Sequence, residues 1–241
     1  MAIKLALAVV ALGFGAGCSQ AGHAANSPCP AGMTLVEGGT LVKDSTVTVA
    51  PYCMDTTEVT VAQYASCARS GQCSAAPTTA FWVDIPDADR DRWSPACNGN
   101  RPDRQDDPVS CVDWAQADTY CRAHGKRLPS AEEWEQAARA GSRGWPHPWG
   151  LAPAASQVCW SGVTKRDGTC PVGSFPEGDT PTGIHDLAGN VWELTSTITN
   201  GDYVAMGAGY NVDNASLVDV AVRIPGEPGF RGPNTGFRCA K

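Results

Sequence analysis

Eleven cysteines are distributed over this chain of 241 residues, and ten of them follow residue 28. An even number of cysteines in an exported chain is typical of a disulfide framework, which ties distant segments together. Spacing alone leaves the pairing open. There is no C-x-x-C pair and no histidine near a cysteine at zinc-finger spacing, so a structural zinc site is not expected. The ten residues are Cys29, Cys53, Cys67, Cys73, Cys97, Cys111, Cys121, Cys159, Cys170 and Cys239.

The N-terminus predicts export. Residues 1–17 hold one basic residue, then an apolar run too short to remain as a membrane span, and small residues before Cys18, as in a secretory signal. The stretch GAGC resembles a lipobox, although Gly15 stands where leucine is preferred. We expect a lipoprotein anchored through Cys18 at the outer membrane or the periplasmic face, with residues 18–28 as a tether. Cleavage further along, giving a soluble periplasmic or secreted protein, is the alternative.

The charge balance of the exported chain is acidic. Residues 1–17 carry one basic residue, Lys4, and no acidic one, so 17 basic and 25 acidic residues remain and the net charge is −8. No basic stripe is present, which argues against nucleic acid as a partner.

The 26 glycines and 18 prolines predict many turns and short elements instead of long helices. Residues 33–43 surround a Gly-Gly turn and are expected to form a hairpin, and residues 47–54 a further strand. Residues 74–110 are rich in Asp, Pro and Arg and are expected to form a loop. Past Gly150 the pattern returns to short strands and turns. We therefore expect an α+β class and one domain over residues 29–241.

Three helices are expected between these segments. The first, within residues 58–71, has Thr60 as its N-cap, and the second lies within residues 110–125. The third lies within residues 128–141, where Ser130 and Glu133 form an S-x-x-E capping box. Each of these ranges ends in a glycine, a common helix stop.

Two carboxylates near the C-terminal third are candidate metal ligands. Asp186 and Glu193 flank a Gly-Asn turn that can double the chain back, and calcium prefers six to eight oxygen ligands of this kind. The alternative is a strand–turn–strand with Trp192 in the core and solvated carboxylates. His185 beside Asp186 is a weak candidate base, because adjacent side chains rarely point at each other, and no G-x-S-x-G elbow is present.

Six blocks of the sequence together resemble one known family. They are GMTLVEGG (32–39), DTTEVTVAQYASC (55–67), DDPVSCVDWAQADTYCRAHGKRLPSAEEWEQAARAG (106–141), PWG (148–150), GIHDLAGNVWELT (183–195) and GFRCA (236–240). Their order and combination resemble the formylglycine-generating enzymes, or sulfatase-modifying factors, over nearly the whole exported chain. The resemblance implies a variant of the C-type lectin fold with few regular elements.

The resemblance also implies a disulfide between Cys121 and Cys239, because family members join the equivalent positions. Such a bridge would tie the C-terminus to a helix. For the other cysteines we expect nearest-neighbour pairs: Cys29–Cys53, Cys67–Cys73, Cys97–Cys111 and Cys159–Cys170.

Family members hold calcium in the block equivalent to HDLAGNVWE. Carried over by position, the ligands would be the side chains of Asp186 and Glu193 and the carbonyls of Gly189 and Val191. The resemblance thus implies structural calcium at these four residues. A second family calcium site is not expected, because Val158 replaces an oxygen-bearing residue there.

The family's enzymes oxidise a substrate cysteine to formylglycine with two cysteines that bind copper(I), for which thiolates are suitable soft ligands. Those cysteines follow a G-G-S-W/Y block, whose equivalent here is residues 207–210, and they would fall at about Val212 and Leu217. No copper is therefore expected.

Three functions follow from these features. The first is a non-catalytic, membrane-tethered domain that binds a peptide, protein or glycan in the former substrate groove, for which Tyr210, Asn211, Val212 and Arg223 are the candidate residues. The second is an active oxidoreductase that uses unrecognised residues. The third is a structural protein of the envelope.

Overall fold

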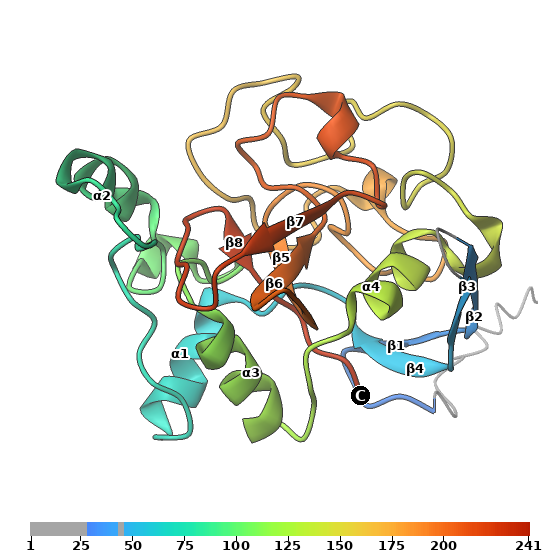
Figure 1. The fold of residues 1–241 in the computed structure, drawn as a ribbon, viewed down its shortest axis with the longest axis horizontal. Helices are drawn as coiled ribbons and strands as arrows, with labels where there is room; N and C mark the ends of the chain where they lie inside the picture. Colours follow the sequence, from blue (N-terminus) through green and yellow to red (C-terminus); the bar gives the residue numbers. More distant parts are fainter. Residues whose placement is uncertain (1–27, 43–45) are drawn as a thin grey trace, which may run out of the picture.

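A computed structural model describes residues 28–42 and 46–241. The predicted signal segment, Cys18 and residues 18–27 of the tether lie outside the described residues. At the centre is a sheet with strand order β7-β6-β5-β8. A lobe within residues 74–110, called the α2 lobe because it carries helix α2, projects from one side of the body (Figure 1). The strands are β5 (Trp192–Thr199), β6 (Asp202–Met206), β7 (Arg223–Gly226) and β8 (Thr235–Gly236). The first three are antiparallel neighbours, and β8 is parallel to β5.

Two small antiparallel pairs precede this sheet. Strand β1 (Met33–Val36) pairs with β4 (Tyr52–Asp55), and β2 (Gly39–Val42) pairs with β3 (Thr46–Val49). The hairpin predicted for residues 33–43 is therefore wrong. The Gly-Gly segment carries the chain from one pair into the other, and a side chain at Gly38 would collide with the Val49 carbonyl, 2.6 Å from its Cβ.

Three helices begin at capping boxes. In α1 (Val61–Arg69), α3 (Trp114–Ala123) and α4 (Ala131–Ala138), the side chain before the helix accepts the N3 backbone N–H and the N3 side chain accepts the cap N–H. The boxes are Thr60 with Gln63, Asp113 with Gln116, and Ser130 with Glu133. The glycines predicted to stop these helices, Gly71, Gly125 and Gly141, lie just past them with positive φ angles of 76°, 66° and 67°.

The segment predicted as a loop, residues 74–110, contains a helix. Helix α2 (Asp87–Trp93) follows Pro86 and is succeeded by 3₁₀ turns at Ser94–Ala96 and Pro102–Arg104. Asp87 and Arg90 form an i,i+3 ion pair of 2.8 Å, and no residue of α2 is buried. The helix was missed because it has no apolar face. Further 3₁₀ turns are Gly141–Arg143, Pro176–Gly178 and Ala215–Leu217.

Buried side chains form two large clusters on either side of the central sheet. One joins α1 and α3 to the sheet through Tyr64, Tyr120 and Phe237, whose rings stack or meet edge to face. The other surrounds Trp134 of α4, which is fully buried. The α2 lobe has a small cluster of its own around Ala80, Cys97 and Cys111.

Five disulfides hold the described residues together: Cys29–Cys53, Cys67–Cys73, Cys97–Cys111, Cys121–Cys239 and Cys159–Cys170. These are the same pairs that the sequence led us to expect. A framework of this density is typical of a protein that is exported to an oxidising compartment. Between residues 28 and 42 and from 46 to the end, no helix is long and apolar enough to cross a membrane.

Candidate functional site

The segment after β6 is buried beside the Cys159–Cys170 disulfide. Gly207 has φ +99°, and a Cβ there would lie 2.9 Å from the Trp134 ring, so only glycine fits. Tyr210 packs against Cys159 and Cys170, and its backbone N–H donates to the Asn190 carbonyl at 2.7 Å. Burial, with a smaller effect of Asp167, raises the pKa of the Tyr210 hydroxyl. Packing and this hydrogen bond therefore fix the position of residues 207–210.

Neither position expected for a copper ligand carries a thiol. Val212 is 9% exposed and belongs to the large apolar cluster of α1 and α3, and Leu217 is 37% exposed at the end of a 3₁₀ turn. All ten cysteines from Cys29 to Cys239 are in disulfides. The described residues therefore hold no free thiol that could bind copper(I) or exchange with a substrate cysteine.

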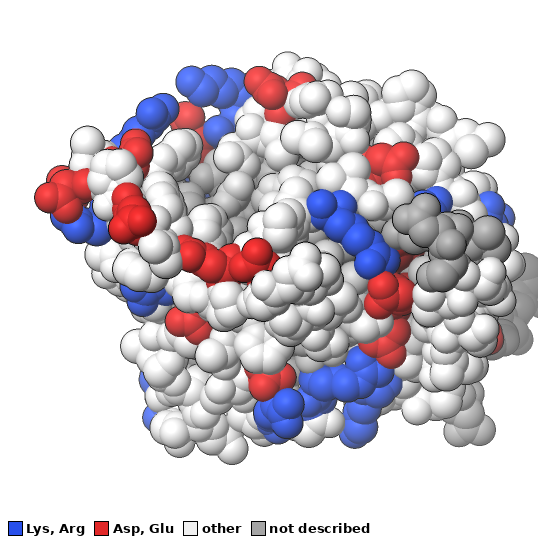
Figure 2. All heavy atoms as spheres, in the orientation of Figure 1, with Lys and Arg blue, Asp and Glu red and all other residues white. Residues whose placement is uncertain are grey.

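A groove lies between the α2 lobe and the body of the molecule, and it consists of two hollows (Figure 2). The first has a volume of about 660 Å³ and the second of about 540 Å³. They share Trp93 and Asn211, so they adjoin at these two residues. Residues that line the first include Trp82, Val83, Asp202, Pro225, Glu227 and Phe230, and those of the second include Arg92, Ser161, Lys165, Arg166, Tyr210 and Asp213.

The α2 lobe is fastened to the loop before β8 along one wall of the first hollow. Phe81 and Arg231 exchange two backbone hydrogen bonds of 3.0 and 2.7 Å, and the Val83 N–H donates to the Glu227 carboxylate. Trp82 stacks on Phe230, with ring centroids 6.0 Å apart and planes at 25°. This wall is therefore aromatic and is held in place by backbone pairing.

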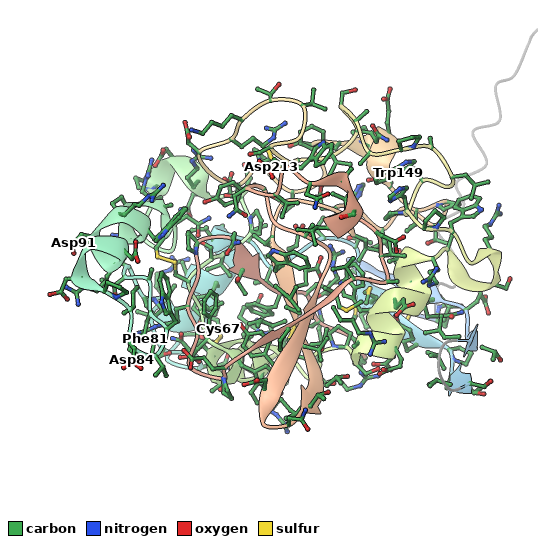
Figure 3. The ribbon with its side chains drawn as sticks, turned by 45° about the horizontal axis from the view of Figure 1, so that its top comes forward. Cys67, Phe81, Asp84, Asp91, Trp149 and Asp213 are labelled. Atoms are coloured by element: carbon green, nitrogen blue, oxygen red, sulfur yellow. A yellow bond between two sulfur atoms is a disulfide. The ribbon has the colours of Figure 1, made fainter. Side chains whose placement is uncertain are left out.

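The second hollow is polar. Arg166 is held by the Trp160 carbonyl at 3.1 Å and by Cys170 Sγ at 3.1 Å, and its guanidinium lies 5.2 Å from the Phe175 ring centroid. The Arg92 guanidinium lies over the Trp93 ring at 4.9 Å. Asp213 lies across this hollow from α2, whose outer end carries Asp91 (Figure 3).

Two of the four candidate groove residues line the groove. Asn211 stands where the hollows meet, and Tyr210 contributes to the second. Val212 is next to them but points into the core. Arg223 lies elsewhere: it forms ion pairs of 2.9 Å with Glu132 and 3.1 Å with Glu135 on α4. The aromatic wall was missed, although tryptophans at positions 82 and 93 in an Asp- and Pro-rich segment were an available signal.

One of the predicted calcium ligands, Glu193, belongs to a buried ion pair. Arg238 is fully buried and binds both Glu193 oxygens at 2.7 Å, and the Trp134 indole N–H donates to Glu193 at 2.8 Å. Asp186 accepts the Gly173 N–H at 2.6 Å, and burial raises the pKa of its carboxyl. Because its oxygens are engaged by Arg238, Glu193 as it lies does not fit a calcium shell. No cluster of three or more acidic, histidine or cysteine ligands suited to a metal is found within the described ranges.

Calcium therefore stays a prediction, and metal analysis of the purified protein tests it. The sequence predicts about one calcium ion per chain, which Asp186→Ala removes. The ion pair of Glu193 with Arg238 instead favours a metal-free protein whose thermal midpoint EDTA leaves unchanged. Asp179→Ala is the matched control, since this half-buried carboxylate is outside the predicted shell and lies 2.7 Å from His185 Nδ1.

The His185 ring is thus placed beside Asp179, not Asp186. Burial raises the pKa of the Asp179 carboxyl, and the neighbouring His185 opposes that shift. No serine or cysteine nucleophile is bonded to this pair among the described residues, so the arrangement has no nucleophile for the histidine to activate.

A mixed fold of few regular elements, five disulfides and an open groove beside a helical lobe define a C-type-lectin-like domain of the formylglycine-generating type. The sulfatase-modifying factor enzyme 1-like domain matches residues 20–241, and the chain belongs to this family. The solved structure titled CarF has the same fold, with a TM-score of 0.65 and 20% identity over 88% of this chain and 98% of that one.

Two curated relatives carry opposite descriptions. One is named inactive C-alpha-formylglycine-generating enzyme 2, from Bos taurus, and is 36% identical over 154 residues, which are 55% of this chain and 50% of the relative. The other is named formylglycine-generating enzyme, from Thermomonospora curvata, and is 32% identical over 202 residues, 68% of this chain and 65% of the relative. The chain spans about half to two thirds of the length of these relatives.

Proposed function

We propose that this protein is a non-catalytic member of the formylglycine-generating family that binds a segment of a partner protein in the groove between the α2 lobe and the body. The observation that supports the proposal is the absence of a free thiol among the described residues beside an open groove. The family resemblance puts the two catalytic thiols at about Val212 and Leu217, while the two hollows remain open. The relative named as inactive is consistent with a family branch that has lost the reaction.

The groove has the features of a binding site for an extended segment. It is concave, its aromatic wall offers large apolar surfaces, and polar side chains at its other end can fix orientation. Its two hollows adjoin, so one ligand can occupy both. The β7 strand at its side contains Pro225, which lacks an N–H, and this weakens the case for a ligand strand that adds to the sheet edge.

We also propose that a lipid on Cys18 tethers the domain at the outer membrane or the periplasmic face. The lipobox-like GAGC and the polar residues that follow it support this proposal. The mass of the first peptide of the exported protein tests it: a diacylated Cys18 supports the anchor, and an unmodified N-terminus beyond Cys18 contradicts it.

Loss of catalysis is tested with copper(I) and a cysteine-containing sulfatase peptide. We expect no stoichiometric copper and no formylglycine in the product peptide by mass spectrometry, because all ten cysteines of the described residues are in disulfides. A catalytically active relative, assayed in parallel, is the positive control. Stoichiometric copper binding or formylglycine product would overturn the proposal in favour of an oxidoreductase.

Groove binding is tested by selection from a random peptide library. Peptides that bind the wild type should not bind Asn211→Trp, because the indole would fill the junction of the two hollows. Gln72→Trp adds the same ring at an exposed position beyond α1 and is the matched control. Failure to enrich any peptide that depends on Asn211 would contradict peptide binding, and glycans that bind through the same junction would indicate a glycan-binding domain instead.

A further inference from the structure

The two ends of the groove differ in charge. The first hollow is lined by the carboxylates of Asp202 and Glu227 and by no cation, which gives its lining a charge of −2. The second is lined by three cations and two carboxylates, which gives a charge of +1. Figure 2 shows basic side chains, with acidic ones among them, along the upper rim of the hollow and acidic side chains along its lower rim. Because both hollows share Trp93 and Asn211, the acidic hollow and the basic hollow adjoin at these residues.

The three cations of the second hollow are available to a ligand. Arg92, Lys165 and Arg166 form no ion pair within the part of the chain that the structure describes. By contrast, the neighbouring Arg101 and Arg104 are paired, with Asp103 at 2.7 Å and Asp107 at 3.0 Å. Arg92 and Lys165 are exposed, and the contacts of Arg166 with a carbonyl, a sulfur and a ring leave its positive charge uncompensated.

The carboxylates of the second hollow do not cancel this charge. Asp167 and Asp213 are both exposed and form no ion pair with the three cations at the distances of the described side chains. An anion that enters this hollow meets three cations and two carboxylates, which is an excess of one positive charge. At the other end it meets two carboxylates.

The first hollow favours a different group. Trp82, Trp93 and Phe230 supply large apolar faces that are suited to an aromatic or branched apolar side chain. One Glu227 oxygen is occupied by the Val83 N–H, so this carboxylate is held at the wall. A ligand carboxylate at this end would approach two like charges, which is unfavourable.

We infer that the groove selects an extended peptide segment with an acidic residue in the Arg92, Lys165 and Arg166 hollow and an aromatic or large apolar residue against Trp82 and Phe230. This inference rests on the proposed function and adds the chemistry of the ligand. The shared residues Trp93 and Asn211 lie between the two anchors, so the segment passes from one hollow to the other over them. The charge contrast fixes which anchor enters which hollow.

The experiment uses the peptides that the library selection yields on the full domain. Peptides that depend on Asn211 should carry an Asp or Glu separated by a few residues from a Trp, Phe or Leu. Their affinity, measured by fluorescence anisotropy with a labelled peptide, should fall about tenfold in Arg92→Glu/Lys165→Glu, since each exposed charge contact contributes modestly and the reversal also adds repulsion. The affinity should also fall as the salt concentration rises.

The decisive experiment reverses the charge of the groove residues and of the peptide together. The double variant should regain affinity for a peptide in which Lys replaces the acidic residue, whereas the wild type should reject that peptide. The single variant Lys165→Glu should shift the preference in the same direction without disturbing the Arg92–Trp93 contact. Arg69→Glu, at the exposed end of α1 outside the groove, makes the same change of charge and should have no effect.

The outcomes separate this inference from the proposed function. If Asn211-dependent peptides show no acidic preference, or if the charge-reversed variant binds them as the wild type does, the inference is wrong and groove binding stands. If no Asn211-dependent peptide is found, the proposed function itself fails.

Discussion

Replacing Arg238 by methionine is expected to destabilise the folded domain by about 3 to 5 kcal/mol, the range observed when one partner of a buried ion pair is removed. Arg238 is the only cation that contacts Glu193 in the described structure, and both side chains have no exposed surface. Burial works to lower the pKa of Arg238, but Glu193, Glu58 and Asp186 together raise it above its usual value. Its positive charge is thus fixed at all physiological pH values.

The cost arises because three buried carboxylates share this one guanidinium. Glu58 lies 3.8 Å from Arg238 and Glu193 lies 2.7 Å from it. Burial, followed by the charge of Asp186, raises the pKa of Glu58 well above its ordinary value, and Arg238 opposes that shift. Without Arg238 the backbone carbonyls of His185, Asp55 and Thr56 would each lose one hydrogen bond, although Thr56 would keep the N–H of His185 as a donor.

Urea unfolding at constant pH measures the effect, and a second substitution identifies its cause. Arg238→Met/Glu193→Gln should recover part of the lost stability, because the glutamine removes the uncompensated charge and still accepts from the Trp134 indole. Arg122→Met, on the exposed face of α3, should change the free energy of unfolding by less than about 0.5 kcal/mol. Equal losses in the single and double variants would show that packing, not charge, dominates.

Removal of the Cys121–Cys239 disulfide is the second large effect. This bridge closes the longest loop of the five, with a sequence separation of 118, and the chain-entropy relation gives a loss of about 5 kcal/mol for Cys121→Ala/Cys239→Ala. The residues it joins are fully buried in the cluster between α3 and β8, so the fold also loses packing there.

The Cys67–Cys73 disulfide is the internal comparison. Its sequence separation is 6, and the same relation gives a loss of about 2 kcal/mol for Cys67→Ala/Cys73→Ala. Unfolding midpoints in urea, measured under non-reducing conditions, should therefore rank the two double variants in this order. A larger loss for the short loop would show that chain entropy does not govern stability in this framework.

Local signals in the sequence predicted local structure well. Thr60 and the Ser130–Glu133 box mark the starts of α1 and α4 because a capping side chain and its partner lie within three residues of each other. Strand pairing was harder. Strand β1 pairs with β4, whose Cys53 exchanges backbone hydrogen bonds with Lys241, so the partner of β1 is set by contacts with the far end of the chain.

The groove could not be assembled from the sequence for a related reason. Its walls come from separated parts of the chain: the α2 lobe, the segment around Lys165, Asp202 with residues 210–213, and the loop between β7 and β8. The segment of residues 210–212 was expected in the groove and Asn211 lies there, but alternation along the chain directs Val212 inward. Arg223 was assigned by proximity in sequence, whereas the sheet directs it toward Glu132 and Glu135 of α4.

The separate cluster of the α2 lobe has an evolutionary consequence. The lobe is stapled to the body by Cys97–Cys111 and by the Phe81–Arg231 pairing, and its apolar residues are grouped apart from the two main cores. Substitutions at exposed lobe positions such as Val83 and Arg92 therefore change the groove wall at little cost to folding. Ligand preference can therefore change through this part of the molecule while the two main cores keep their packing.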